Sequence, residues 1–438
     1  MGHFGVTILL SFAEGGKREA ESAFLMSSYD AGSWASILMI VCLLSAVVGL
    51  LLAGFGLTDS RLRDDVLSER VLLANIMVQI CVGNTFLLLK GHYSTVGLYF
   101  LASALMCLVR YRMHASRLAF LGSLVDLVVE VFQAYRSTLV VACVLIIAAQ
   151  TLVLLWWGAF FVSLFSASLP GQEAVGEWPL VLLLLFSWYW TTQFFQALVS
   201  FVLGGCVLWY YEVRRLEGRE EVNPGGVRVR LYSTCALTSS LGSVCKGGLF
   251  AGMCSRVLSL AYHLVEQRDH AMELRSMYIS RLYAFIISVM APLTEFAQRN
   301  HKLAFALSAT YGSTYSKSGT DQYNKYPESV DLLLLDADEE MQTLNALGGT
   351  VAGMMALVFA LCARNAGSSR SLFLLLCYLM AYSGVTLALH CYSAAIYAFV
   401  VAFSNDETTV PLDCTPSLRW GRKLEERRGR GVSASESI

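Results

Sequence analysis

The sequence is poor in charged residues and in proline. Only 15% of its 438 residues are charged and only seven are proline, whereas 56% are hydrophobic. An average soluble domain has about 25% charged residues. This composition excludes a soluble multidomain protein, a disordered chain and a nucleic-acid-binding module. It predicts an all-α, polytopic helical membrane bundle embedded in the lipid bilayer.

Metal-binding and disulfide patterns are missing as well. The twelve cysteines contain no C-x-x-C pair and no Cys/His cluster with metal-ligand spacing. Eleven of them fall inside apolar stretches, which is typical of small side chains packed between helices. We therefore expect neither a metal site nor a cofactor.

Acidic side chains are nearly absent from the apolar stretches, where Glu295 is the only one. His390 is the lone histidine in such a stretch and is expected to be a satisfied core residue. Pumps, ion-coupled carriers and membrane enzymes generally need buried carboxylates or histidine clusters. No Walker sequence and no G-x-S-x-G elbow is present either. The sequence therefore predicts no catalytic residues and no enzyme.

Long apolar runs occupy residues 34–404, which we expect to form one transmembrane domain. A hydrocarbon core about 30 Å thick requires about 20 apolar residues per helix. The fifth, sixth and ninth runs exceed 30 residues, so each must be tilted, broken or extended beyond the bilayer. The ninth could instead be two spans hinged near Gly384, which would give ten. The nine candidate spans are 34–57, 71–89, 94–109, 138–165, 180–211, 231–262, 279–297, 342–363 and 371–403.

The distribution of Lys and Arg predicts the orientation of these spans. Alternate loops sum to 22 basic residues on one side and 8 on the other, and the basic side is ordinarily cytoplasmic. Residues 1–33 are then a short external segment, and residues 405–438 form a disordered cytoplasmic tail. Two further segments, 117–136 and 300–340, are not expected to span. The first is amphipathic and is expected at the cytoplasmic interface or packed under the bundle.

Aromatic and amide side chains lie at membrane depth in the second and fifth runs. Asn and Gln in hydrocarbon require partners, so they face other helices or an aqueous path. Ring faces beside such a path bind quaternary ammonium. For Trp188 and Trp190, a binding role and an interfacial role stay equally open, whereas Trp209, Tyr210 and Tyr211 are expected to be interfacial anchors. The candidate substrate-binding residues are Asn75, Gln79, Trp188, Tyr189, Trp190, Gln193 and Gln196.

Glycines are expected to mark close helix packing. Gly242, Gly247 and Gly248 in the sixth run remove side-chain bulk, so a neighbouring helix can approach or the helix can bend. Gly205 is expected to do the same in the fifth run.

Four motifs occur in a fixed order along the chain. They are Arg110-Tyr-Arg-Met-His-Ala-Ser-Arg117-Leu-Ala-Phe; Trp190-Thr-Thr-Gln193-Phe194 leading through Gly205 to Trp209-Tyr210-Tyr211; Leu241-Gly242-Ser243-Val-Cys-Lys246-Gly247; and Ala304-Phe305 with Ala309 and Tyr311-Gly312-Ser-Thr-Tyr315. In order and spacing they resemble the motifs of choline transporter-like proteins, a solute carrier family. The resemblance implies a multi-pass transporter of choline or a related small organic cation, in the plasma membrane or an organelle membrane. Transport would be facilitated or weakly coupled.

Helical spacing in the fifth run predicts a position for such a substrate. Trp190, Gln193 and Ala197 share one helix face, and Tyr189 and Gln196 lie on the adjacent one. A groove between the two stripes could seat a trimethylammonium group against Trp190 or Tyr189, with Gln193 or Gln196 meeting the hydroxyl.

Three features depart from the family pattern, and one of them is that Asn300-His301-Lys302 stands where the family has an Asn-Arg run. The first helix and large external loop of the family are not visible, which leaves nine helices instead of ten. Lys246 occupies an ordinarily apolar position, where a buried ammonium would repel a cation unless it pairs with carbonyls or a hydroxyl outside the path. The alternative is therefore a non-transporting scaffold or degenerate paralogue. The sequence does not predict the oligomeric state.

Overall fold

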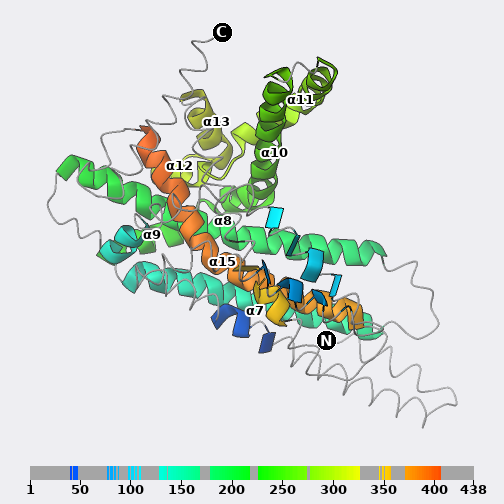
Figure 1. The fold of residues 1–438 in the computed structure, drawn as a ribbon. Coiled ribbons are helices and arrows are strands. Elements are labelled where there is room, and N and C mark those ends of the chain that lie inside the picture. Colours follow the sequence, from blue (N-terminus) through cyan, green and yellow to red (C-terminus); the bar gives the residue numbers. More distant parts are fainter. Residues whose placement is uncertain are drawn as a thin grey trace.

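The regular structure in the described part of the chain is helical (Figure 1). The computed structural model describes residues 128–135, 137–167, 178–217, 225–273, 277–325, 351–356 and 370–405, with short stretches between 40 and 109 and positions 345, 348 and 349.

Within these residues four helices are long and apolar enough to cross a membrane. The helical membrane fold is thereby confirmed, and the total of nine spans stays a prediction. Each of the four stretches overlaps a predicted span, and they cover Thr138–Phe160, Leu182–Glu212, Tyr278–Tyr311 and Leu376–Ala402. The third runs beyond the predicted end at residue 297, into the segment that was expected not to span.

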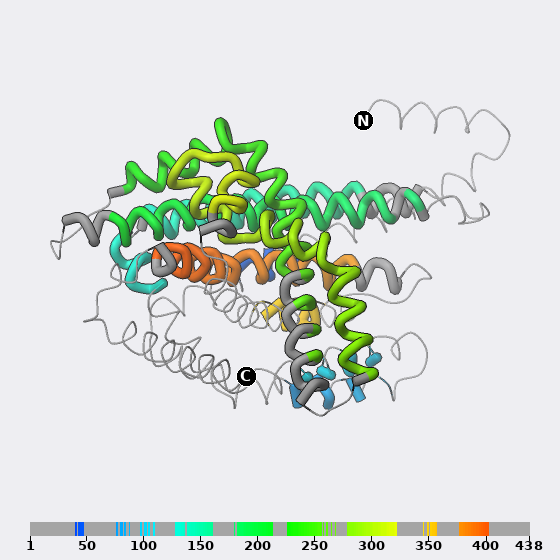
Figure 2. The backbone as a smooth tube through the Cα atoms, turned by 90° about the horizontal axis from the view of Figure 1, so that it is seen from above, coloured from blue at the N-terminus to red at the C-terminus, as the bar shows by residue number. Residues whose placement is uncertain are grey.

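The 40-residue helix α8 (Trp178–Glu217) is the central element. It packs against α7 (Ser137–Ala167) and α15 (Arg370–Asn405), and these three helices lie side by side (Figures 1 and 2). Most of the stretch Leu376–Ala402 of α15 is buried, because its many Ala and Ser side chains let neighbouring backbones approach. α7 instead alternates buried and exposed apolar residues, as expected of a helix with one face toward lipid.

The ninth predicted span is one continuous helix, α15, and not two spans hinged at Gly384. A Cβ atom added at Gly384 would lie 2.7 Å from the Oγ of Ser45. This glycine therefore lets the short helical stretch 43–47 approach α15, and the ten-span interpretation of this run is wrong.

The sixth predicted span is broken into α9 (Gly225–Leu237) and α10 (Leu241–Glu273). The break falls on Thr238, Ser239 and Ser240. The Thr238 hydroxyl donates to the carbonyl of Thr234 at 2.7 Å, and the Ser240 amide donates to the carbonyl of Cys235 at 2.8 Å. The Ser239 hydroxyl also donates to the carbonyl of Cys235, at 3.4 Å. Hydroxyl side chains that bond to nearby carbonyls compete with the helical ladder, and two in succession lie where α9 ends.

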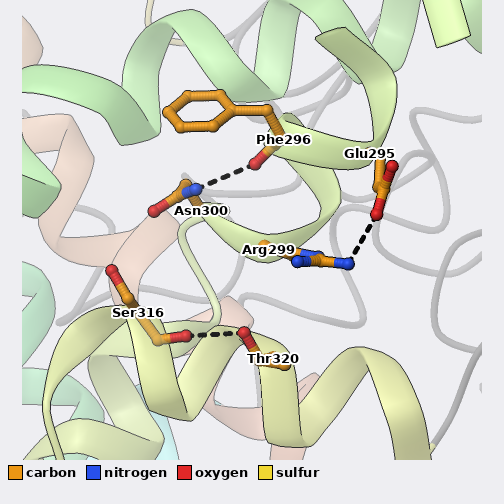
Figure 3. Close-up of polar contacts among 6 residues, drawn as sticks. All are labelled: Glu295, Phe296, Arg299, Asn300, Ser316 and Thr320. Atoms are coloured by element: carbon orange, nitrogen blue, oxygen red, sulfur yellow. Dashed lines mark hydrogen bonds and ion pairs between the residues drawn. The ribbon is translucent and has the colours of Figure 1, made fainter. Parts of the chain in front are cut away.

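α10 and α11 (Met277–Arg299) form a hairpin that runs steeply across α8 (Figures 1 and 2). At the end of α11 the Asn300 side-chain amide donates to the carbonyl of Phe296 at 2.9 Å, and Arg299 pairs with Glu295 at 2.5 Å (Figure 3). Glu295, the one acidic residue expected in a span, is thus paired at an exposed helix end.

Both segments that were expected not to span pack against α8. Residues 128–135, the described part of 117–136, bury Val128, Val131 and Phe132 in the core. This confirms packing under the bundle for these residues. The short helix α12 (Ala304–Tyr311) buries its first five residues against α8 and leads into α13 (Tyr315–Lys325).

Candidate functional site

The backbones of α8 and α10 come close together at Gly248. A Cβ atom added there would lie 3.1 Å from the Cα of Phe194 and 3.2 Å from the carbonyl oxygen of Gln193. Small residues allow helix backbones to approach in this way, and a side chain at Gly248 would require the neighbouring backbone to shift by a few tenths of an ångström. This close approach is what a packing role of Gly248 requires.

One turn further along α10, two of the candidate side chains converge on Gly252. A Cβ atom added at Gly252 would lie 2.5 Å from the Oε1 of Gln193 and 3.4 Å from the hydroxyl oxygen of Tyr189. Tyr189 and Gln193 are four residues apart and so share a face of α8. The structure brings an amide, a phenol hydroxyl and bare helix backbone together, and we refer to Tyr189, Gln193 and Gly252 as the α8–α10 junction.

Gly252 was not among the residues expected from the sequence. Its signal is the G-x-x-x-G spacing from Gly248 to Gly252, which places both glycines on one helix face. The spacing predicts close packing, but it does not say which side chains of which helix lie opposite.

The three consecutive aromatic residues of α8 do not share one groove. Trp190 is 42% exposed and its ring lies 6.2 Å from that of Phe186 on the outer face. Trp188 packs against the buried cluster that contains Leu154 and Trp157. Its Nε1 is buried without a hydrogen-bond partner in the described part of the chain. Only Tyr189 points to α10.

The other candidate residues, Gln196, Gln79 and Asn75, have no described contact with the α8–α10 junction. Gln196 is half-buried on α8, and Gln79 is buried in the stretch 79–81. Asn75 lies outside the described residues. A shared path for Gln79, Gln196 and the α8–α10 junction stays a prediction.

Of the three other glycines that were expected to pack, Gly205 and Gly247 have close neighbours and Gly242 has none among the described residues. A Cβ atom at Gly205 would lie 2.8 Å from the ring of Tyr232, and one at Gly247 would overlap the rings of Phe305 and Tyr315. At Gly242 no described atom lies within 4 Å of such a Cβ atom. The described residues therefore give no support for a packing role of Gly242.

Lys246 lies away from the α8–α10 junction. It is six residues from Gly252, about 120° away around the helix, and its exposed ammonium donates to the Oγ of Ser316 at 2.6 Å. The expected pairing with a hydroxyl is found.

Tyr315 precedes Ser316 in α13 and is buried. Burial raises the pKa of the Tyr315 hydroxyl well above its usual range, so this hydroxyl stays protonated and donates to the Asn300 carbonyl at 2.7 Å.

The aromatic end of α8 is part of the core. Tyr210 and Tyr211 are buried, so their interpretation as interfacial anchors is wrong. The pattern misleads because an aromatic run at a helix end looks the same whether lipid or protein covers it. Tyr210 donates to a carboxyl oxygen of Glu130 at 3.2 Å, and the Arg228 guanidinium lies 3.8 Å from the ring centroid of Trp209.

The interior between α8 and α15 contains a buried polar pair. The Oγ of Ser200 and the Nε2 of His390 lie 2.9 Å apart and share a hydrogen bond. His390 is thus a satisfied core residue, as expected. In the described part of the chain, no three His, Cys, Asp or Glu side chains come together as a metal site would require.

Comparisons with known proteins agree with the motif order. The sequence profile of a family described as plasma-membrane choline transporter matches residues 98–408. A CTL-like protein of Dictyostelium discoideum is 22% identical over 266 residues, which cover 59% of this chain and 44% of that relative. The matched part thus spans less than half the length of the relative.

Proposed function

The chain belongs to the choline transporter family, whose profile matches well over half of it, and from this premise we propose that it carries a choline-like organic cation across a membrane. Transport is facilitated or weakly coupled, and the plasma membrane is the proposed location. The observation that carries the proposal is the α8–α10 junction, where Tyr189 and Gln193 of α8, a helix long and apolar enough to cross a membrane, meet Gly252 of α10.

The chemistry of this junction suits a quaternary ammonium that carries a hydroxyl. Such an ion cannot donate a hydrogen bond from nitrogen, so an aromatic ring face recognises it at about 0.5–2 kcal/mol per ring. Tyr189 offers a ring, and the Gln193 amide offers an acceptor for the substrate hydroxyl. Trp190 faces outward on α8, so Tyr189 is the proposed ring.

The position of Lys246 supports transport over the alternative of a non-transporting scaffold. Its ammonium is paired with Ser316 on an exposed face of α10. A cation at Tyr189 and Gln193 would therefore approach a different face of α10, about 120° away around the helix, and Lys246 would not block it.

Uptake of labelled choline in a choline-transport-deficient host tests the proposal. Tyr189→Ala should raise the apparent KM about tenfold, since about 1.4 kcal/mol corresponds to that factor. Tyr189→Phe keeps the ring and should raise KM less. Trp190→Ala is the matched control for loss of an aromatic side chain and should leave KM nearly unchanged. Absence of saturable uptake by the wild type at normal surface expression would refute the proposal.

A further inference from the structure

We infer that Gly252 is a positioning residue that holds the Gln193 amide where it can bind the hydroxyl of the substrate. Gly252 would thereby let the site distinguish a hydroxyl-bearing quaternary ammonium from one without a hydroxyl. The inference rests on the proposed function and adds a determinant of specificity to it.

The geometry singles out the amide of Gln193. A Cβ atom at Gly252 would lie 2.5 Å from Oε1 but 3.2 Å from Cδ of the same side chain. A separation of 2.5 Å between a methyl carbon and an amide oxygen is well inside van der Waals contact. Any side chain at position 252 must therefore displace the tip of Gln193.

The displaced group is the end of a flexible side chain, and this distinguishes Gly252 from Gly248. At Gly248 the atoms opposite belong to the backbone of Gln193 and Phe194, so a methyl group there must push the helices apart. At Gly252 the helices can stay in place while the amide rotates away. The two glycines of one G-x-x-x-G pair therefore have separable roles, one in packing and one in positioning.

Displacement of the Gln193 amide should affect only the binding of the substrate hydroxyl. The Tyr189 hydroxyl lies 3.4 Å from the same Cβ position, an ordinary contact, so the ring that would hold the ammonium need not move. Loss of the amide acceptor removes one hydrogen bond, which lowers affinity about three- to tenfold. Choline should lose this factor, whereas tetramethylammonium, which has no hydroxyl, should not.

The experiment compares wild type, Gly252→Ala, Gln193→Ala and the double variant at matched surface expression. The readouts are the KM and maximal rate of choline uptake, and the inhibition constant of tetramethylammonium against that uptake. Gly252→Ala should raise the choline KM about three- to tenfold and leave the other two values within about twofold. Because Gln193→Ala removes the atom that the new methyl meets, Gly252→Ala should have no further effect in that background. Gly242→Ala, at an open position on the same helix, is the control.

Other outcomes separate the inference from the function on which it rests. Equal weakening of choline and tetramethylammonium, or additive effects in the double variant, would show that Gly252 only packs and would overturn the inference alone. A wild type without saturable choline uptake would overturn both. If Gly252→Ala does not reach the surface, the double variant is compared with Gln193→Ala: equal KM values support the inference, and a higher KM in the double variant overturns it.

Discussion

A glycine in a membrane helix can be interpreted from what a methyl group would touch at its position. At Gly247 the atoms in the way belong to the rings of Phe305 and Tyr315, which are both buried. Neither ring can rotate freely, because they pack against each other with centroids 4.8 Å apart. Gly242, in the same helix, has open space among the described residues. The pair offers a test at the scale of a single methyl group.

Gly247→Ala should destabilise the protein by about 1–3 kcal/mol, the usual cost of overpacking a filled core. Gly242→Ala should be neutral or slightly stabilising, since alanine is the better helix former. The thermal unfolding midpoint of the purified protein in detergent measures both changes. Equal midpoints for the two variants would show that the rings above Gly247 yield without cost.

At the scale of the element, α8 connects the parts of the bundle through its C-terminal turns. Tyr135 donates to the Cys206 carbonyl at 2.8 Å, and Tyr210 donates to Glu130 at 3.2 Å, so residues 128–135 are tied to α8 twice. On another side of α8, the exposed Tyr311 of α12 donates to Glu212 at 3.0 Å. The two tyrosine–carboxyl bonds differ mainly in burial.

Tyr210→Phe should destabilise the protein by about 1–2 kcal/mol, because the half-buried Glu130 carboxyl loses a hydrogen bond beside the buried Tyr210 ring, where water replaces it incompletely. Tyr311→Phe should cost less than about 0.5 kcal/mol, since water replaces the lost bond at an exposed site. Both ring systems are retained, so thermal midpoints in detergent report the hydroxyl alone. A larger loss for Tyr311→Phe would contradict the assignment of α8 and residues 128–135 as one packed unit.

Prediction from the sequence succeeded where the determining property is local. Apolar length alone marks the spans of α7, α8, α11 and α15, because the hydrocarbon thickness acts on each helix separately. The break after Leu237 also has a local cause, because the hydroxyls of Thr238 and Ser239 bond to carbonyls within one turn. Burial of Tyr211 and the position of Gln193 over Gly252 depend on which helices become neighbours. No periodicity in one helix contains that information.

At the scale of the whole molecule, the basic residues near the two ends of α8 predict how the protein is oriented in the membrane. α8 is described from end to end, so its two ends must lie on opposite sides of the bilayer if it spans. The stretch 166–179 before its apolar core contains no Lys or Arg, whereas 212–230 after it contains five. One of these five, Arg228, lies against Trp209 at the same end. Basic residues are retained on the cytoplasmic side, so the end of α8 at Glu217 should be cytoplasmic.

An epitope inserted before Trp178 should therefore be labelled in intact cells, and one inserted after Glu217 only after permeabilisation. The same rule applied to all loops, with 22 basic residues against 8, predicts that an epitope after Ile438 behaves like the one after Glu217. Two tags on the predicted cytoplasmic side, separated by more than half the chain, make the test independent of any single insertion. Labelling of either tag without permeabilisation, with choline uptake retained, would contradict the prediction. It would show that the orientation of α8 is reversed or that the number of crossings between the two tags is odd.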